Sequence, residues 1–291
     1  TVFTAPYPSY ARRGYGCIVV DEEGQERIDF INNMTSLILG HANPKVVEAV
    51  VSQVREGACF SWPTESEIRL AEIITSRVRS VERIRFANSG SEAVMVAIKG
   101  ARAYTGKPKI AKFEGCYHGA YDYVEVSLDP TPESGGDSRA PRPVLYSRGS
   151  SAGILQDVVV LPFNDLEAVE WILSKEKDSL AAVIVDPMPN RAGLIPAKPG
   201  FMPALREMTR RFGILLICDE VITFRLSYNG AQHVFGFEAD LTTFGKVIGG
   251  GFAIGAIGGS ADVMSVFDPT KGKARMPHFG TFNANPVTMV A

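Results

Sequence analysis

The chain has 291 residues, of which 45% are hydrophobic and 21% charged, with 30 basic and 32 acidic side chains. This length can bury a sizeable core as one large domain or two modest ones. The formal net charge of −2 offers no basic surface for nucleic acid, and no apolar run reaches the roughly 20 residues of a membrane-spanning helix.

The first 80 residues contain the signals of two helices. Asn43 and Pro44 supply a cap and a first-turn proline, and four valines recur on one face of the segment that follows. Thr64 and Glu67 have the spacing of a capping box before a second apolar stripe. We therefore expect helices to begin at residues 44 and 65.

The centre of the chain alternates between strand and helix patterns. Residues 84–88 (IRFAN) are typical of a short buried strand, and a helix is expected from Ser91 to about Tyr104. The apolar run 181–187, a helical segment 201–212 and the apolar run 214–220 form a strand-helix-strand unit. This order predicts an α/β fold with a mainly parallel sheet flanked by helices.

Two further expectations concern the organisation of the chain. Residues 129–151 are rich in Pro, Gly and Ser, which indicates a long, mobile loop. The chain begins at Thr1 and stops in what reads as the first turns of a helix, so we expect a fragment. Its four cysteines and four histidines are scattered, which favours free thiols in a reducing, cytoplasmic compartment and argues against a metal site.

Ser89-Gly90-Ser91 joins a predicted strand to a predicted helix. Free N–H groups and the positive end of the helix dipole suit such a corner to a phosphate, although the serines could serve only as helix caps. The common nucleotide-binding fingerprints fail near the glycine-rich segment after Lys246, because Val247 replaces the Ser or Thr of a P-loop.

Asp219 lies at the carboxyl end of one predicted strand, and Lys246 comes after the next. Parallel α/β sheets bind ligands at the carboxyl ends of their strands. A poorly solvated lysine has a lowered pKa and becomes a usable nucleophile and base, although a salt-bridged Asp and a surface Lys are the commoner fates of such residues. A phosphate cradle, an acid and an amine at one sheet edge together match the requirements of pyridoxal 5′-phosphate (PLP).

Five motifs sharpen this interpretation. They are NSGSEA from Asn88, CYHGAYD from Cys116, CDEVIT from Cys218, DLTTFGKVIGGG from Asp240 and GTFNANP from Gly280. Together they closely resemble class III aminotransferases, and most of all the branch that contains glutamate-1-semialdehyde aminomutase and the β-amino-acid transaminases. The resemblance extends over nearly the whole chain.

The resemblance implies a fold-type-I PLP-dependent transferase that works as a homodimer with shared active sites. Residues 1–42 would contribute to the small domain, residues 43–291 would form the large PLP-binding domain, and the family's C-terminal small domain would be absent. Lys246 would be the catalytic Schiff-base lysine and Asp219 the partner of the pyridinium nitrogen. Further cofactor contacts would come from Ser89, Gly90, Ser91, Tyr117, His118, Val221 and, across the subunit interface, Thr281.

Some residues depart from the aminomutase pattern. Trp62 stands where aminomutases usually have a small residue, Asp186 replaces a Glu, and Arg191 replaces an Asn. Trp62 and Arg191 could equally be a packed side chain and a surface charge. Glu92, Glu220 and Arg225 are interpreted as structural groups.

The predicted activity is amino transfer between an amino acid or amine, including a β-amino acid, and a keto acid. Two alternatives remain: glutamate-1-semialdehyde 2,1-aminomutase, and a PLP-binding protein that has lost catalysis. The implied partners are small molecules, with neither nucleic acid nor membrane.

Overall fold

The computed structural model describes residues 10–270 and 272–291. Its centre is a seven-stranded sheet in the order β4-β12-β11-β10-β9-β5-β8. Of the seven strands, β12 alone runs in the direction opposite to the others, so the predicted mainly parallel sheet is confirmed. The strands are β4 (Arg83–Ala87), β5 (Lys109–Phe113), β8 (Val158–Leu161), β9 (Leu180–Val185), β10 (Leu215–Asp219), β11 (Leu241–Gly245) and β12 (Gly255–Gly259).

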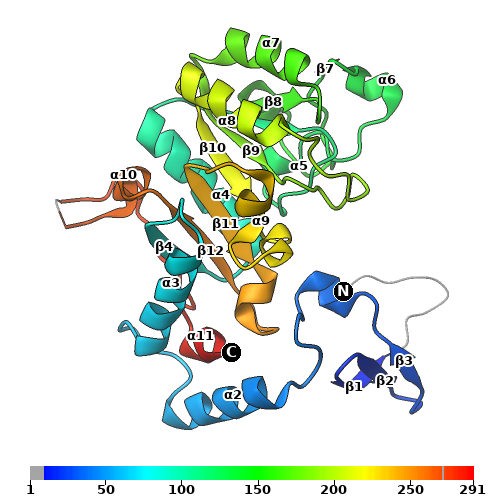
Figure 1. Cartoon of the computed structure of the whole chain (residues 1–291), viewed down its shortest axis with the longest axis vertical. Helices are drawn as coiled ribbons and strands as arrows, with labels where there is room; N and C mark the ends of the chain where they lie inside the picture. The colour runs from blue at the N-terminus through cyan, green and yellow to red at the C-terminus, as the bar shows by residue number, and fades with distance from the viewer. Residues whose placement is uncertain (1–9, 271) are drawn as a thin grey trace.

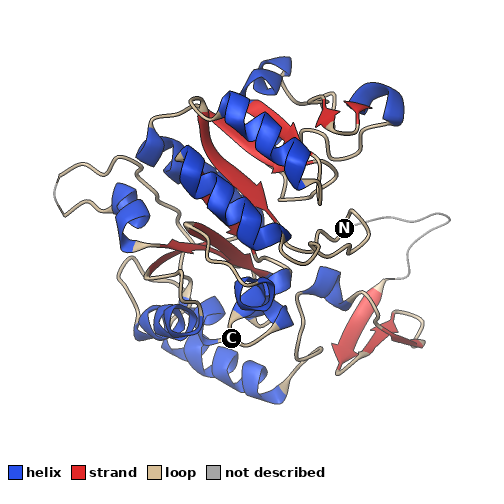
Figure 2. Cartoon of the chain, turned by 45° about the horizontal axis from the view of Figure 1, so that its top comes forward, coloured by secondary structure: helices blue, strands red, loops and turns tan. Residues whose placement is uncertain are grey.

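Helices cover both faces of this sheet (Figure 2). Alternate residues of the strands point to opposite faces, and the buried side chains accordingly divide between two main clusters. One cluster joins the sheet to α4 (Gly90–Thr105), and the other joins it to α7 (Leu166–Glu176) and α8 (Phe201–Phe212). The helices predicted for residues 91–104 and 201–212 are confirmed. Gly106 and Gly213 end α4 and α8 in the left-handed conformation that glycine favours.

The N-terminal residues form a separate antiparallel sheet beside the main body (Figure 1). Its strands are β1 (Ala11–Tyr15), β2 (Ile18–Asp21) and β3 (Glu26–Ile28), followed by α1 (Asn32–Thr35). The two helices expected next are α2 (Pro44–Glu56) and α3 (Glu65–Arg77), and the side chains of Asn43 and Thr64 cap them. The predicted capping box forms only in part, because Thr64 accepts from Glu67 N without a return bond to the Glu67 side chain. The valine stripe of α2 is only partly covered: Val47, Val51 and Val54 are all exposed to about half. The proposed domain boundary at residue 42 stays a prediction.

The long loop predicted for residues 129–151 is wrong in part. Pro132 begins a one-turn helix, α6 (Pro132–Gly135), and Thr131 and Ser134 cap it reciprocally. A two-residue hairpin of β6 (Gly136–Asp137) and β7 (Ala140–Pro141) follows. The Pro and Gly content thus marks tight local structure, because Thr131-Pro132 is a helix start and Gly136, at φ 77°, turns the chain into the hairpin.

Short elements complete the described chain: α5 (Asp122–Glu125), η1 (Ala152–Asp157), η2 (Thr223–Leu226), α9 (Gly230–Phe235), η3 (Lys246–Gly249), α10 (Ala261–Met264), η4 (Ser265–Phe267) and α11 (Pro286–Val290). The last of these is the helix start expected near the C-terminal residues. Within residues 10–270 and 272–291, no helix is both long enough and apolar enough to cross a membrane.

Candidate active site

Three strands of the central sheet, β4, β10 and β11, deliver the predicted chemical groups to one edge of the sheet. Asp219 is the last residue of β10, and Lys246 directly follows β11. Pairing of β11 with β12, and of β12 with β4, places Gly245, Gly255 and Ala87 side by side. The Ser89-Gly90-Ser91 corner, which follows β4, therefore lies at the same edge as Lys246.

Asp219 is a buried carboxylate with three hydrogen-bond donors. The backbone N–H of Val221 and the hydroxyl of Thr243 donate to Oδ1 at 3.1 and 3.0 Å, and His118 Nδ1 lies 2.7 Å from Oδ2. Because an ionised carboxylate only accepts, Nδ1 carries the hydrogen of this bond. The set of donors suits an ionised Asp219 and fixes the direction of its side chain.

The imidazole of His118 is hydrogen-bonded to the Asp219 carboxylate. Its side chain is fully buried, and its second ring nitrogen, Nε2, has no partner among the described residues. A buried polar atom without a partner is uncommon in folded proteins and asks for an explanation. The structure thus joins His118 to the candidate site through the Asp219 carboxylate.

Lys246 combines partial burial with an unusual backbone. Its φ of 48° lies in the left-handed region, which costs a non-glycine residue about 1 kcal/mol and is concentrated at functional sites. Burial lowers the pKa of its amine, and the charge of Asp219 opposes this shift in part. Among the described residues, no side-chain or backbone group forms a hydrogen bond with Lys246 Nζ. The amine is therefore available for chemistry.

The Ser89-Gly90-Ser91 corner begins α4. Ser89 Oγ accepts from the N–H of Glu92 at 3.1 Å, and Ser91 Oγ accepts from Ala120 N at 3.0 Å. The capping role that the sequence left open for Ser89 is therefore present. Both hydroxyl hydrogens are still able to donate to an anion, and the N-terminus of a 16-residue helix favours negative charge there. Glu92 accepts from a backbone N–H, which confirms its structural interpretation.

Two glycines keep the corner narrow. A Cβ on Gly90 would lie 3.0 Å from both γ-carbons of Val221, and a Cβ on Gly119 would lie 2.4 Å from Ser91 Oγ. The loop after β10 and the Tyr117-to-Gly119 turn are therefore packed against the start of α4. Tyr117, predicted to stack on the cofactor, is exposed at this turn.

Thr281 lies in a different environment. With the exposed Trp62 and Phe279 it lines a cavity of about 670 Å³, and Trp62 is 83% exposed, so it does not pack into this chain. Asn283, two residues after Thr281, accepts a hydrogen bond from Asn88 at 3.0 Å, which brings this loop beside the start of the phosphate corner.

Arg191 pairs with Asp129 at 2.6 Å on the surface, which favours the surface-charge interpretation.

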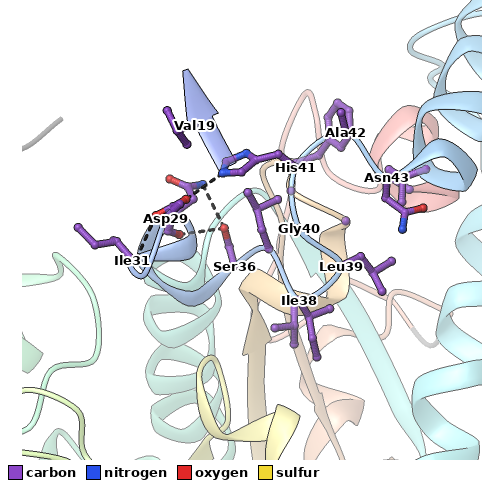
Figure 3. Close-up of a pocket in the computed structure, with 18 of the residues that line it drawn as sticks. Val19, Asp29, Ile31, Ser36, Ile38, Leu39, Gly40, His41, Ala42 and Asn43 are labelled. Carbon is purple, nitrogen blue, oxygen red and sulfur yellow. Dashed lines mark hydrogen bonds and ion pairs between the residues drawn. The ribbon is translucent and has the colours of Figure 1, made fainter. Parts of the chain in front are cut away.

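A second cavity, of about 970 Å³, separates the N-terminal segment from the loop after Lys246. Figure 3 shows Asp29, bonded to His41 at 2.8 Å, on one wall, and Ile38 and Leu39 on another. Its lining includes Val247 but neither Lys246, Asp219 nor the serine corner. We therefore place the site by its converging polar groups rather than by the size of this hollow.

Sequence reasoning missed Thr243, and it marked Asp186 only as a departure from the aminomutase pattern. Thr243 pairs with Asp219 in register and bonds its carboxylate; a polar residue within the buried run LTTFG is the signal that could have revealed it. Asp186 follows β9 at the position next to Asp219, and burial together with the charge of Asp219 raises its pKa to about 7.

The side chain of Glu220, by contrast, accepts hydrogen bonds from Ala231 and Gln232, which is a structural role as predicted. Arg225 donates to the backbone oxygen of Thr35, also a structural contact.

Comparisons with known proteins point to one family. The sequence model of the family described as aminotransferase class-III matches residues 4–291. A glutamate-1-semialdehyde 2,1-aminomutase from Ignicoccus hospitalis is 45% identical over 98% of the chain and 66% of its own length. The chain thus spans slightly less than two thirds of such relatives.

Several solved structures resemble the fold over the whole length of this chain. An omega-transaminase from Sphaerobacter thermophilus has a TM-score of 0.97 and 56% identity, covering 100% of this chain and 66% of its own. A transaminase with PLP bound has a TM-score of 0.92 and 46% identity, and the match covers 99% of this chain and 66% of the transaminase. A β-phenylalanine aminotransferase from Variovorax paradoxus has a TM-score of 0.86 and 38% identity, covering 99% and 62%.

Proposed function

Because the chain belongs to the class-III aminotransferases, a family of PLP enzymes, we propose that it moves an amino group between an amino acid or amine and a keto acid. The observation that carries the proposal is the meeting of three groups at one sheet edge. These are the amine of Lys246, which has no hydrogen-bond partner among the described residues, the Asp219 carboxylate with its three hydrogen-bond donors, and the narrow Ser89-Gly90-Ser91 corner.

The residues present fit PLP. When bound, PLP supplies an aldehyde that takes up an amine and a ring that withdraws electrons from the reacting carbon. The corner before α4 offers hydroxyl and N–H donors to a phosphate, and Asp219 offers an ionised carboxylate to a protonated ring nitrogen. Tyr117 and Val221 are the candidates for the two faces of the ring.

Lys246 supplies the acid–base chemistry. Its lowered pKa makes the neutral amine more accessible near neutral pH, which a covalent attachment and a proton acceptor both require. The same amine can accept a proton from the substrate carbon and later return it. Partial burial keeps competing water away, while the absence of a hydrogen-bond partner in the described chain leaves Nζ free to move between these tasks.

We also propose a homodimer with shared sites in the cytoplasm. Thr281, Trp62 and Phe279 form an exposed, largely aromatic surface next to the loop that contacts Asn88. A partner subunit covering this surface would place Thr281 near the partner's phosphate. The four cysteines are free, as expected for a reducing compartment. Sedimentation of the wild type and of Trp62→Asp tests the dimer, because the charged variant should sediment as a monomer.

A donor screen tests the activity. The purified protein, loaded with PLP, is mixed with α-amino acids, β-amino acids including β-phenylalanine, and simple amines, each with a keto-acid acceptor. We expect an amino donor to give both a free keto product and an aminated acceptor. If no donor in the panel changes the absorbance of the bound cofactor, the protein binds PLP without catalysis.

A second candidate is the aminomutase reaction, favoured by the name of the 45% identical relative. An aminomutase returns the amino group to the same carbon skeleton, so it forms its product without an added acceptor. Glutamate-1-semialdehyde given to the PLP-loaded protein distinguishes the two. Conversion to 5-aminolevulinate in the absence of any keto acid would establish the aminomutase and overturn the transaminase proposal.

A further inference from the structure

Two carboxyl groups lie side by side at the end of the central strands. β9 and β10 are parallel, with Cys218 opposite Val185, so the next residues, Asp219 and Asp186, occupy adjacent positions. Each is only 4% exposed. Two neighbouring carboxylates with so little water cannot both ionise cheaply, because each charge raises the cost of the other.

The hydrogen bonds divide the two acids. Asp219 has donors on both oxygens, from Val221, Thr243 and His118. Asp186 accepts one backbone hydrogen bond, from Met188 at 3.0 Å. Hydrogen bonds to the charged form favour ionisation, so Asp219 is the better carboxylate of the pair.

The other groups around Asp186 give it no compensating cation. Among the described residues, the charges that act on it most strongly are the carboxylates of Asp219 and Glu220, both from β10 and the residue after it. Thr223, from η2, contributes a hydroxyl. The thiols of Cys116 and Cys218 also face this carboxyl group, and burial holds the pKa of both thiols far above neutral. The two basic groups near the pair, His118 and Lys246, both interact with Asp219: His118 is bonded to it, and the charge of Asp219 acts on the amine of Lys246.

We propose that Asp186 is a positioning residue that stays protonated beside the ionised Asp219, so that this edge of the sheet carries one negative charge rather than two. A neutral carboxylic acid can donate a hydrogen bond as well as accept one. Asp186 thereby presents a donor to the site while Asp219 alone presents the charge. The relation to the cofactor rests on the proposed function, whereas the protonation of Asp186 rests on the fold.

The sign of the pH effect follows from linkage. Burial, followed by the charge of Asp219, raises the pKa of Asp186 from 3.8 to about 7. Between these values the folded protein holds a proton that the unfolded chain has lost. The stabilisation is complete at low pH and is lost as the pH rises through about 7.

Unfolding of the whole chain between pH 5 and 8 tests the proposal. As the pH rises from 5 to 7, the folding equilibrium constant of the wild type should fall by up to about tenfold per pH unit relative to that of Asp186→Asn, whose amide mimics the neutral acid. Asp178→Asn, a change at an exposed residue, is the matched control and should follow the wild type. Parallel curves for wild type and Asp186→Asn would overturn the proposal.

A second variant covers the possibility that Asp186→Asn does not fold. Removing the neighbouring charge in Asp219→Asn should move the Asp186 transition to lower pH, and an unmoved transition would contradict the coupling of the two acids. A spectroscopic measurement tests the link to the cofactor. The absorbance of the PLP-loaded wild type should change near pH 7, and this change should vanish in Asp186→Asn. Failure of the wild type to transfer amino groups would defeat the proposed function and leave the unfolding result in force.

Discussion

Lys112 and Lys246 lie in two regions of the molecule and share a lowered pKa. Lys112, in β5, is fully buried, and burial lowers its pKa to about 8. Its Nζ donates to the backbone oxygens of Phe113 at 3.0 Å and Val126 at 2.8 Å. Lys246 is less buried, forms no hydrogen bond through Nζ within the described chain, and lies close enough to Asp219 for that charge to act on it.

The contrast between these two amines means that a perturbed pKa does not by itself identify a reactive lysine. The ammonium hydrogens of Lys112 are held by two carbonyls, and its surroundings exclude a substrate. Lys246 sits at the strand ends, where open α/β sheets bind ligands. What distinguishes Lys246, the lysine proposed to react, is an amine without a hydrogen-bond partner in the described chain, at the edge of the sheet and with an acid nearby.

The largest expected effect comes from removing the Lys246 amine. Lys246→Ala should reduce amino transfer by about 10³-fold or more, because both the nucleophile and the acid–base group are lost. Steady-state assays of the PLP-loaded variant measure this. Lys112→Met is the comparison variant, and it should keep most of the activity at a temperature where it stays folded. Equal losses in both variants would remove the distinction between the two lysines.

A smaller effect concerns stability around Lys112. Its folded pKa of about 8 lies below the ordinary 10.5, so the unfolded chain holds the proton more firmly between these values. The protein should therefore gain up to about 3 kcal/mol of stability from this group as the pH rises from 8 to 10.5. Chemical unfolding at several pH values checks the gain, which should be absent in Lys112→Met. A rise of equal size in that variant would assign the effect to another group.

The smallest effect extends the comparison to the adjacent acids Asp219 and Glu220. Glu220 accepts hydrogen bonds from Ala231 N at 2.7 Å and from Gln232 N and Nε2 at 3.1 and 3.0 Å. In Glu220→Gln, the new side-chain NH₂ group would face one of these N–H donors, and neither could accept the other's hydrogen. The variant should therefore lose about 1–3 kcal/mol of stability. Thermal unfolding measures the cost. Activity below the transition should be retained, and a large loss there would give Glu220 a part in catalysis.

Much of the fold could be predicted because it rests on local patterns. The periodic apolar residues of the central strands and of α4 and α8 indicated their structure directly, and Gly213 marked the end of α8. The long loop failed because Thr131-Pro132 is a helix start that composition alone conceals. The valine stripe of α2 did mark an apolar face, but what covers that face lies outside the sequence pattern.

The candidate site divides in the same way. Lys246, Asp219 and the serine corner carry sequence signals, since each lies at or just after the end of an apolar strand. The bond between His118 and Asp219 joins residues 101 positions apart, and no local pattern encodes it. The burial of Lys112 was equally hidden, because the two lysines of the strand KIAKF are typical of a strand with one face in solvent. Such partners depend on strand order and packing, which appear only in three dimensions.

The proposed function requires that PLP is attached to Lys246 and to no other lysine. Reduction of the PLP-loaded protein with borohydride, followed by proteolysis and mass spectrometry, fixes any covalent link between PLP and a lysine. We predict one modified peptide, which contains Lys246, and an unmodified Lys112. Modification at Lys112 or at another lysine, or PLP that washes off after reduction, would contradict the account.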